Sequence, residues 1–216
     1  MNVFVLCTGR CGSTTFIKAC EHITNYSCTH ESRQAEIGKD RLNYPKNHIE
    51  ADNRLSWMLG RLDLKYGDDA FYVHLRRNEN DTAHSFTRRF SHGIIQAYRK
   101  VILPGLPETS DPQFVSLDYC NTVNSNIEHF LKDKSKKMTV NLENIYSDFP
   151  EFWNMIVAEG DIGAALAEFS IKYNATIPPP EKKKETLALK EENLILRILS
   201  KLRRLIIKFP KYIKNA

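Results

Sequence analysis

The stretch that most constrains the fold is the first sixteen residues, where a short apolar run enters a loop with two glycines. Residues 2–7 have the continuous apolar character of a buried strand. Gly9 and Gly12 follow, and a helix is expected at 14–22. Because a strand, a glycine loop and a helix N-terminus direct backbone N–H groups to one point, this order predicts an anion site within an α/β fold.

The rest of the chain alternates short apolar runs with helical patterns. Further strands are expected at 25–30, 70–75 and 137–145, and helices at 52–64, 80–98, 113–131 and 150–173, the last broken near Gly160. This alternation predicts a parallel sheet covered by helices on both faces. Ligands of such folds bind beyond the carboxyl ends of the strands, where the loops after residues 6 and 75 are expected to lie.

The loop lacks the lysine of an ATP or GTP site. In those loops a Gly-Lys-Ser/Thr sequence binds the β- and γ-phosphates, and the hydroxyl binds Mg²⁺. Here Ser13 follows Gly12 directly, and the cation is Arg10, two residues before Gly12. The backbone N–H groups from Cys11 to Thr15 and the positive end of the helix dipole remain. This pattern favours a shorter anion that needs no metal. The alternative is that both glycines simply shape a strand–helix turn.

A second segment, "LRRNENDTAHSF", suggests another phosphate contact. Arg77 comes just past the expected strand at 70–75, and Ser85 follows eight residues later in the expected helix. A guanidinium and a hydroxyl placed in this way can bind one phosphate from two elements. The alternative is a surface arginine that forms salt bridges and a serine on a helix face.

Together these two segments resemble the sulfotransferase family, whose members use 3′-phosphoadenosine 5′-phosphosulfate (PAPS). "GRCGSTTF" resembles the family's 5′-phosphosulfate loop, and "RNENDTAHS" resembles its 3′-phosphate segment, with the same Arg-to-Ser spacing of eight. "VNLENIYSDFPEFW" resembles a later family segment less specifically. The resemblance reaches from residue 2 to about residue 175 and implies a sulfotransferase fold of the P-loop NTPase type. The chain lacks the Lys-Thr-His strand and the late Lys-Gly segment of the aryl and steroid branch, so it is more similar to bacterial carbohydrate-type members.

The resemblance implies roles for particular residues. PAPS would donate a sulfuryl group to an acceptor hydroxyl on a carbohydrate or glycolipid, without a metal. The residues implied at its 5′ end are Arg10, Cys11, Gly12, Ser13, Thr14 and Thr15. Arg10 would also stabilise the departing oxygen, and Arg77 and Ser85 would bind the 3′-phosphate. Glu31 is the first choice for the catalytic base and His30 the second; the alternative is a solvated His-Glu pair at the end of a strand. Alternation along the strand predicts that one of the pair faces the site.

Other polar residues are weaker candidates. His48 and Glu50 are considered for acceptor contact, whereas His74 lies inside an expected strand and is predicted to be a core histidine. Arg88 and Arg89 either line the mouth of the site or are surface charge. The five cysteines are expected to be reduced thiols, because their odd number does not suggest a secreted disulfide framework. The segments 32–50 and 100–115 are expected to determine the acceptor.

The tail at 178–216 carries most of the basic charge. Residues 181–216 hold eight Lys and three Arg against four Glu, so the remaining 180 residues sum to −2 although the net charge is +5. This distribution argues against nucleic-acid binding by the body. After a Pro-rich linker, an apolar stripe predicts an amphipathic helix at 187–209. The helix would dock on the body or a second subunit, or lie on an anionic membrane surface; Lys182 to Lys184 would alternatively close over the cofactor.

Two hypotheses from other classes stay open. One is a nucleotide kinase with a degenerate P-loop, which the missing lysine and the lack of an Asp-rich Mg²⁺ strand disfavour. The other is a non-catalytic anion-binding or scaffold protein that works through its tail. No signal peptide and no run of 18 uncharged apolar residues is seen, so we expect a cytoplasmic protein with one α/β domain at 1–177. If the tail binds a membrane, it would link this domain to the inner membrane surface.

Overall fold

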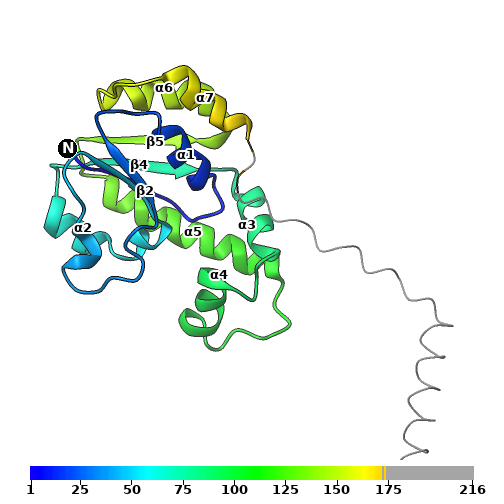
Figure 1. Cartoon of the computed structure of the whole chain (residues 1–216). Helices are drawn as coiled ribbons and strands as arrows, with labels where there is room; N and C mark the ends of the chain where they lie inside the picture. The colour runs from blue at the N-terminus through cyan, green and yellow to red at the C-terminus, as the bar shows by residue number, and fades with distance from the viewer. Residues whose placement is uncertain (172, 174–216) are drawn as a thin grey trace, which may run out of the picture. The chain divides into compact units, whose positions relative to one another are not determined.

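The computed structural model describes residues 1–171 and 173 (Figure 1). In this part of the chain, five parallel strands form one sheet in the order β2-β3-β1-β4-β5. The strands are β1 (Val3–Leu6), β2 (Ser27–His30), β3 (His48–Ala51), β4 (Phe71–Arg76) and β5 (Lys137–Asn141). The predicted α/β fold with a parallel sheet is therefore confirmed.

The first strand lies in the middle of this sheet and is buried on both faces. Val3 pairs with Ile49 of β3 on one side and with Phe71 of β4 on the other. Val3 and Val5 pack into one hydrophobic cluster, whereas Phe4 and Leu6 pack into the cluster on the opposite face. The continuous apolar run at the start of the sequence thus reflects a strand that serves two cores.

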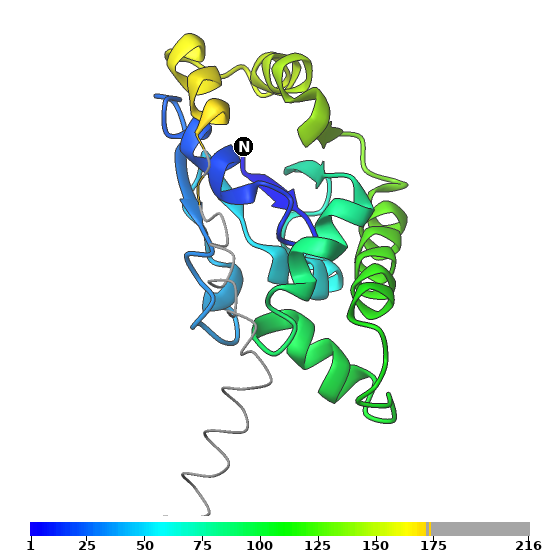
Figure 2. The same cartoon turned by 90° about the vertical axis from the view of Figure 1, so that its right-hand side faces the viewer.

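Helices cover both faces of the sheet (Figures 1 and 2). The cluster with Val3 and Val5 includes side chains of α1 (Ser13–Cys20), α6 (Ile145–Met155) and α7 (Ile162–Ala167). The cluster with Phe4 and Leu6 includes side chains of α2 (Leu59–Tyr66), α3 (Glu79–Thr87), α4 (Gly93–Ala97) and α5 (Pro112–Leu131). Short helical turns complete the described part: η1 (Asp40–Leu42), η2 (Asn53–Trp57), η3 (Tyr98–Ile102), η4 (Leu142–Asn144) and η5 (Glu168–Ser170).

One unexpected strand and two interrupted helices distinguish the structure from the sequence expectations. The strand β3 was not predicted, because His48 and Glu50 interrupt its apolar pattern, yet both are buried. The expected helix at 80–98 is interrupted: α3 ends at Thr87, and α4 starts at Gly93, whose φ of 62° departs from a right-handed helix. The expected helix at 52–64 is instead the turn η2 followed by α2. The break near Gly160 is confirmed, and a Cβ there would lie 2.1 Å from the His22 carbonyl oxygen.

The strand order places a topological switch beside β1. The chain moves from β1 to β2 and β3 on one side of the sheet, and β4 and β5 then extend it on the other side. The connections that leave β1 and β4 therefore diverge, and a crevice between them is the usual ligand site in such sheets. Both segments expected to bind anions start at these two strand ends.

The described residues contain no helix that is both long and apolar enough to cross a bilayer. All five cysteines are free thiols, as expected. The linker, Lys182 to Lys184 and the amphipathic helix expected at 187–209 lie outside the described residues.

Candidate active site

A cavity of about 1020 Å³ lies at the carboxyl ends of β1, β2, β3 and β4. The segments that follow these four strands line it, together with residues after β5 and near η5. The lining residues are Gly9, Arg10, Gly12, Ser13, Thr14, Thr15, His30, Glu31, Asn53, Arg54, Arg77, Asp81, His84, Ser85, Phe86, Arg88, Arg89, His92, Gly93, Ile94, Leu142, Ile145, Tyr146, Phe169, Ile171 and Tyr173. The loops after β1 and β4 therefore lie at this edge of the sheet, as predicted, and both line the cavity.

The loop after β1 is shaped by left-handed backbone conformations. Gly9, Arg10 and Gly12 have φ angles of 81°, 59° and 88°. A Cβ on Gly12 would lie 2.9 Å from Leu142 Cδ1, so the loop packs closely against the start of η4. Arg10 has a Cβ and adopts this conformation nonetheless, which is uncommon and costs free energy. The loop is thus a constrained structure that brings the N-terminus of α1 to the cavity.

The Arg10 side chain joins the two predicted anion-binding segments. The Arg10 Nε donates a hydrogen bond to Ser85 Oγ at 3.0 Å. The backbone carbonyl oxygen of Arg10 accepts a hydrogen bond from Arg77 Nη1 at 3.4 Å. Burial lowers the pKa of Arg10, and the charges of Arg89 and Arg77 lower it further. These arginines line one cavity and their like charges repel one another, an arrangement that an anion would stabilise.

The second segment also has a structural role at the start of α3. Asn78 is the N-cap of this helix, and its Oδ1 accepts a hydrogen bond from the backbone N–H of Asp81 at 3.1 Å. The Asn78 N–H in turn donates to Glu143 Oε1 at 2.7 Å. Arg77 precedes this cap, and its Nη2 lies 3.8 Å from Asp81 Oδ2. The cap therefore orients Arg77 at the end of β4.

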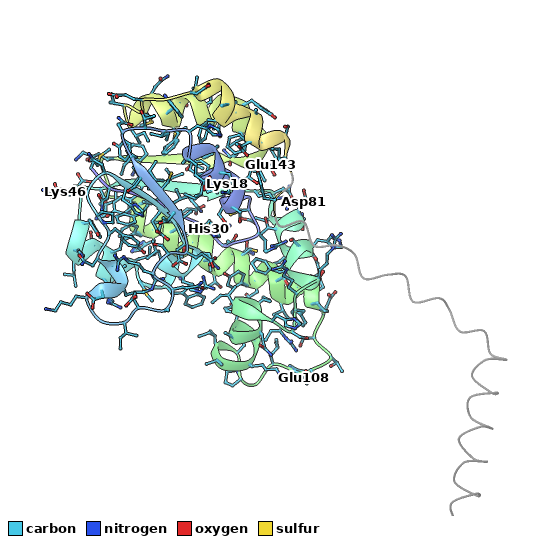
Figure 3. All side chains as sticks on the ribbon, viewed as in Figure 1. Lys18, His30, Lys46, Asp81, Glu108 and Glu143 are labelled. Atoms are coloured by element: carbon cyan, nitrogen blue, oxygen red, sulfur yellow. The ribbon has the colours of Figure 1, made fainter. Side chains whose placement is uncertain are left out.

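His30 and Glu31 both line the cavity at the end of β2. His30 Nε2 lies 3.1 Å from Ser13 Oγ, so it contacts the first hydroxyl of the β1 loop. Figure 3 shows His30 at the end of β2 and Asp81 on α3. Glu31 adopts a left-handed conformation with a φ of 54° directly after the strand. This conformation breaks the alternation of the strand, so the prediction that one of the pair would face the site was wrong.

Glu31 is held by an arginine that sequence reasoning missed. Arg54 Nη1 lies 2.8 Å from Glu31 Oε2 and 3.4 Å from Asp52 Oδ1. Asp52 is fully buried and forms an ion pair with Arg41, which is 2% exposed. Arg54 and its neighbour Asn53 follow β3, so their place at the cavity depends on a strand that the sequence did not reveal. Asn53 Oδ1 is buried without a hydrogen-bond partner among the described residues, so it is available to a donor in the cavity.

His48 and Glu50 are not acceptor contacts, because both are buried away from the cavity. Glu50 accepts hydrogen bonds from Thr29 Oγ1 at 2.6 Å and from Ser32 Oγ at 2.7 Å, and His48 Nδ1 lies 2.8 Å from Ser27 Oγ. Burial alone would raise the pKa of Glu50, but its hydrogen bonds to His48, Thr29 and Ser32 outweigh it and lower this pKa. These two residues join β2 to β3.

His74 is a buried core histidine, as predicted, and its Nε2 lies 3.2 Å from Asn124 Oδ1. Arg88 and Arg89 line the cavity and are also exposed at the surface, so both interpretations of these residues hold in part. The Cys11 side chain is buried under the loop and does not line the cavity. A hydrogen bond between the thiols of Cys11 and Cys7 lowers the pKa of Cys11. Only the backbone of Cys11 can therefore serve the site.

Comparisons with known proteins come from structure. No protein-family model matches this sequence, and no curated protein matches it. The solved structures that resemble it include mouse sulfotransferase SULT7A1 complexed with PAP, with a TM-score of 0.51 and 16% identity over 78% of this chain. The chain has a sulfotransferase fold. It spans 62% of the length of the mouse sulfotransferase. The sulfotransferase domain from the curacin biosynthetic pathway is also similar, with a TM-score of 0.48 and 13% identity over 79% of this chain and 78% of that one.

Proposed function

We propose that this protein is a PAPS-dependent sulfotransferase that modifies a hydroxyl group, with a carbohydrate or glycolipid as the favoured acceptor. The observation that carries the proposal is the meeting of Arg10, Arg77 and Ser85 in one cavity, through contacts of 3.0 Å and 3.4 Å. These residues come from two strands at a topological switch and are far apart in the sequence. Two separate cation-bearing segments beside a helix N-terminus suit a ligand with two anionic groups.

The residues present fit both anionic ends of PAPS. Arg10 and the segment from Cys11 to Thr15 would hold the 5′-phosphosulfate, through the guanidinium, backbone N–H groups and hydroxyls. Arg77 and Ser85 would hold the 3′-phosphate. When bound, PAPS supplies a sulfuryl group and has adenosine 3′,5′-bisphosphate as its leaving group. Among the described residues, five arginines and two carboxylates, Glu31 and Asp81, line the cavity, so its charge favours this highly anionic ligand.

The protein would contribute mainly positioning and electrostatic stabilisation, as in phosphoryl transfer. Arg10 would stabilise negative charge on the departing oxygen. Glu31 would accept the proton of the acceptor hydroxyl, and its ion pair with Arg54 at 2.8 Å orients its carboxylate in the cavity. His30 is the second candidate base, but its contact with Ser13 Oγ at 3.1 Å also suits support of the loop. A base in this position would contribute about 10²–10⁴-fold to the rate.

The decisive test is calorimetric titration with adenosine 3′,5′-bisphosphate and, separately, with ATP. We expect the bisphosphate to bind more tightly, and Arg77→Gln to weaken that binding about tenfold or more through loss of a charge-assisted contact. Arg76→Gln is the matched control, because Arg76 pairs with Glu79 and Glu128 and does not line the cavity. A preference for ATP would support the kinase hypothesis and overturn the proposal. Binding of the bisphosphate without turnover of PAPS on any hydroxyl acceptor would support a non-catalytic role.

A further inference from the structure

A further arginine, Arg89, lies just beyond the end of α3 and lines the same cavity as the proposed 3′-phosphate residues. Asp81, Ser85 and Arg89 are spaced by four residues, and Arg77 stands four residues before Asp81. All four line the cavity. Positions four apart lie on the same side of a helix, and a hydrogen bond from the Arg89 N–H to the Phe86 carbonyl continues the turn beyond the end of α3. Arg77 thus precedes α3 and Arg89 follows it, one on each side of Ser85.

The charge of Arg89 acts on Arg10, as that of Arg77 does. Among the charged groups near Arg10, Arg89 contributes most to the lowering of the Arg10 pKa, ahead of Arg77. Arg10 Nε lies 3.0 Å from Ser85 Oγ, and Arg10, Ser85, Arg77 and Arg89 all line one cavity. Arg77 has Asp81 at 3.8 Å, whereas Arg89 has no ion pair with any carboxylate in residues 1–171 and 173.

We propose that Arg89 is a cofactor-binding residue that holds the 3′-phosphate of PAPS together with Arg77 and Ser85. This inference rests on the proposed function. A phosphate monoester carries about −1.5 to −2 charges at pH 7, which a single arginine already paired with Asp81 does not balance. With the phosphate on Ser85, its oxygens replace the Arg10 Nε–Ser85 contact, and Arg10 is released toward the phosphosulfate end.

The test compares two ligands that differ by the 3′-phosphate alone, adenosine 3′,5′-bisphosphate and adenosine 5′-monophosphate. Both are titrated calorimetrically at one ionic strength into the wild type, Arg89→Gln and Arg76→Gln. We expect Arg89→Gln to weaken bisphosphate binding about tenfold or more and to leave monophosphate binding within about threefold. Arg76→Gln removes the same charge from an arginine that pairs with Glu79 and Glu128 and does not line the cavity, and it should have a much smaller effect.

The outcomes separate the two proposals. An equal loss of affinity for both ligands, no loss for either, or an equal effect of Arg76→Gln would overturn the assignment of Arg89 while the proposed function stands. Failure of the wild type to bind the bisphosphate would overturn the proposed function, and this assignment with it. Retained monophosphate binding shows that the Arg89→Gln protein is folded.

Discussion

Replacing Gly12 with alanine tests whether the β1 loop is the rigid anion-binding structure that the proposal requires. Gly12 has a φ of 88°, and an alanine in a left-handed conformation costs about 1–2 kcal/mol. Its Cβ would also lie 2.9 Å from Leu142 Cδ1. Because Leu142 is partly exposed and can move, this contact should cost about 1 kcal/mol, at the low end of overpacking effects. We therefore expect Gly12→Ala to lower the free energy of unfolding by about 2–3 kcal/mol.

Two further variants divide this loss into its parts, each measured by urea unfolding. Gly38→Ala is the matched control, because Gly38 has a φ of 58° and an added Cβ there meets nothing within 4 Å. It should show the backbone cost alone, about 1–2 kcal/mol. In a Leu142→Ala background, Gly12→Ala should become less destabilising by about 1 kcal/mol. If Gly12→Ala costs no more than Gly38→Ala, the loop is not held against Leu142 and the reasoning is refuted.

Three further predictions concern the base, the buried ion pair and acid stability. Glu31→Gln should reduce PAPS-dependent sulfation about 10²–10⁴-fold while bisphosphate affinity stays unchanged, and wild-type activity in this variant would exclude Glu31 as the base. Asp52→Ala leaves Arg41 buried without its partner, so urea unfolding should show a loss of about 3–5 kcal/mol, whereas removal of the exposed Lys18–Glu21 pair should leave stability unchanged. The pKa of Glu50 is lower in the folded protein than its ordinary value of about 4.5. Ionised Glu50 therefore stabilises the fold at pH values above about 4.5, and this contribution is lost as the pH falls through the lower folded-state pKa. The difference in unfolding free energy between wild type and Glu50→Gln should therefore shrink from pH 7 to pH 4, and a constant difference would contradict the assignment.

Much of the fold was predictable because its determinants are local. The apolar run of β1, the aromatic and β-branched residues of β4 and the polar residues that cap α3 act on their immediate neighbours in the chain. The strand β3 was not predictable in this way. His48 and Glu50 are buried in it only because Ser27, Thr29 and Ser32, near or within β2, provide hydrogen-bond partners. That pairing depends on which strand becomes the neighbour of β3.

The same division applies to the site. The sequence by itself determined that a glycine loop with Arg10 follows the first strand, and that Arg77 and Ser85 follow a later one, because both patterns are continuous in the chain. Tertiary structure decided that Arg10 Nε reaches Ser85 Oγ, 75 positions away, and that Arg54 from the end of β3 pairs with Glu31. It also decided that His30 and Glu31 both line the cavity. Local residues encode backbone conformations, whereas contacts between strand ends depend on strand order, which only the packing of the whole sheet selects.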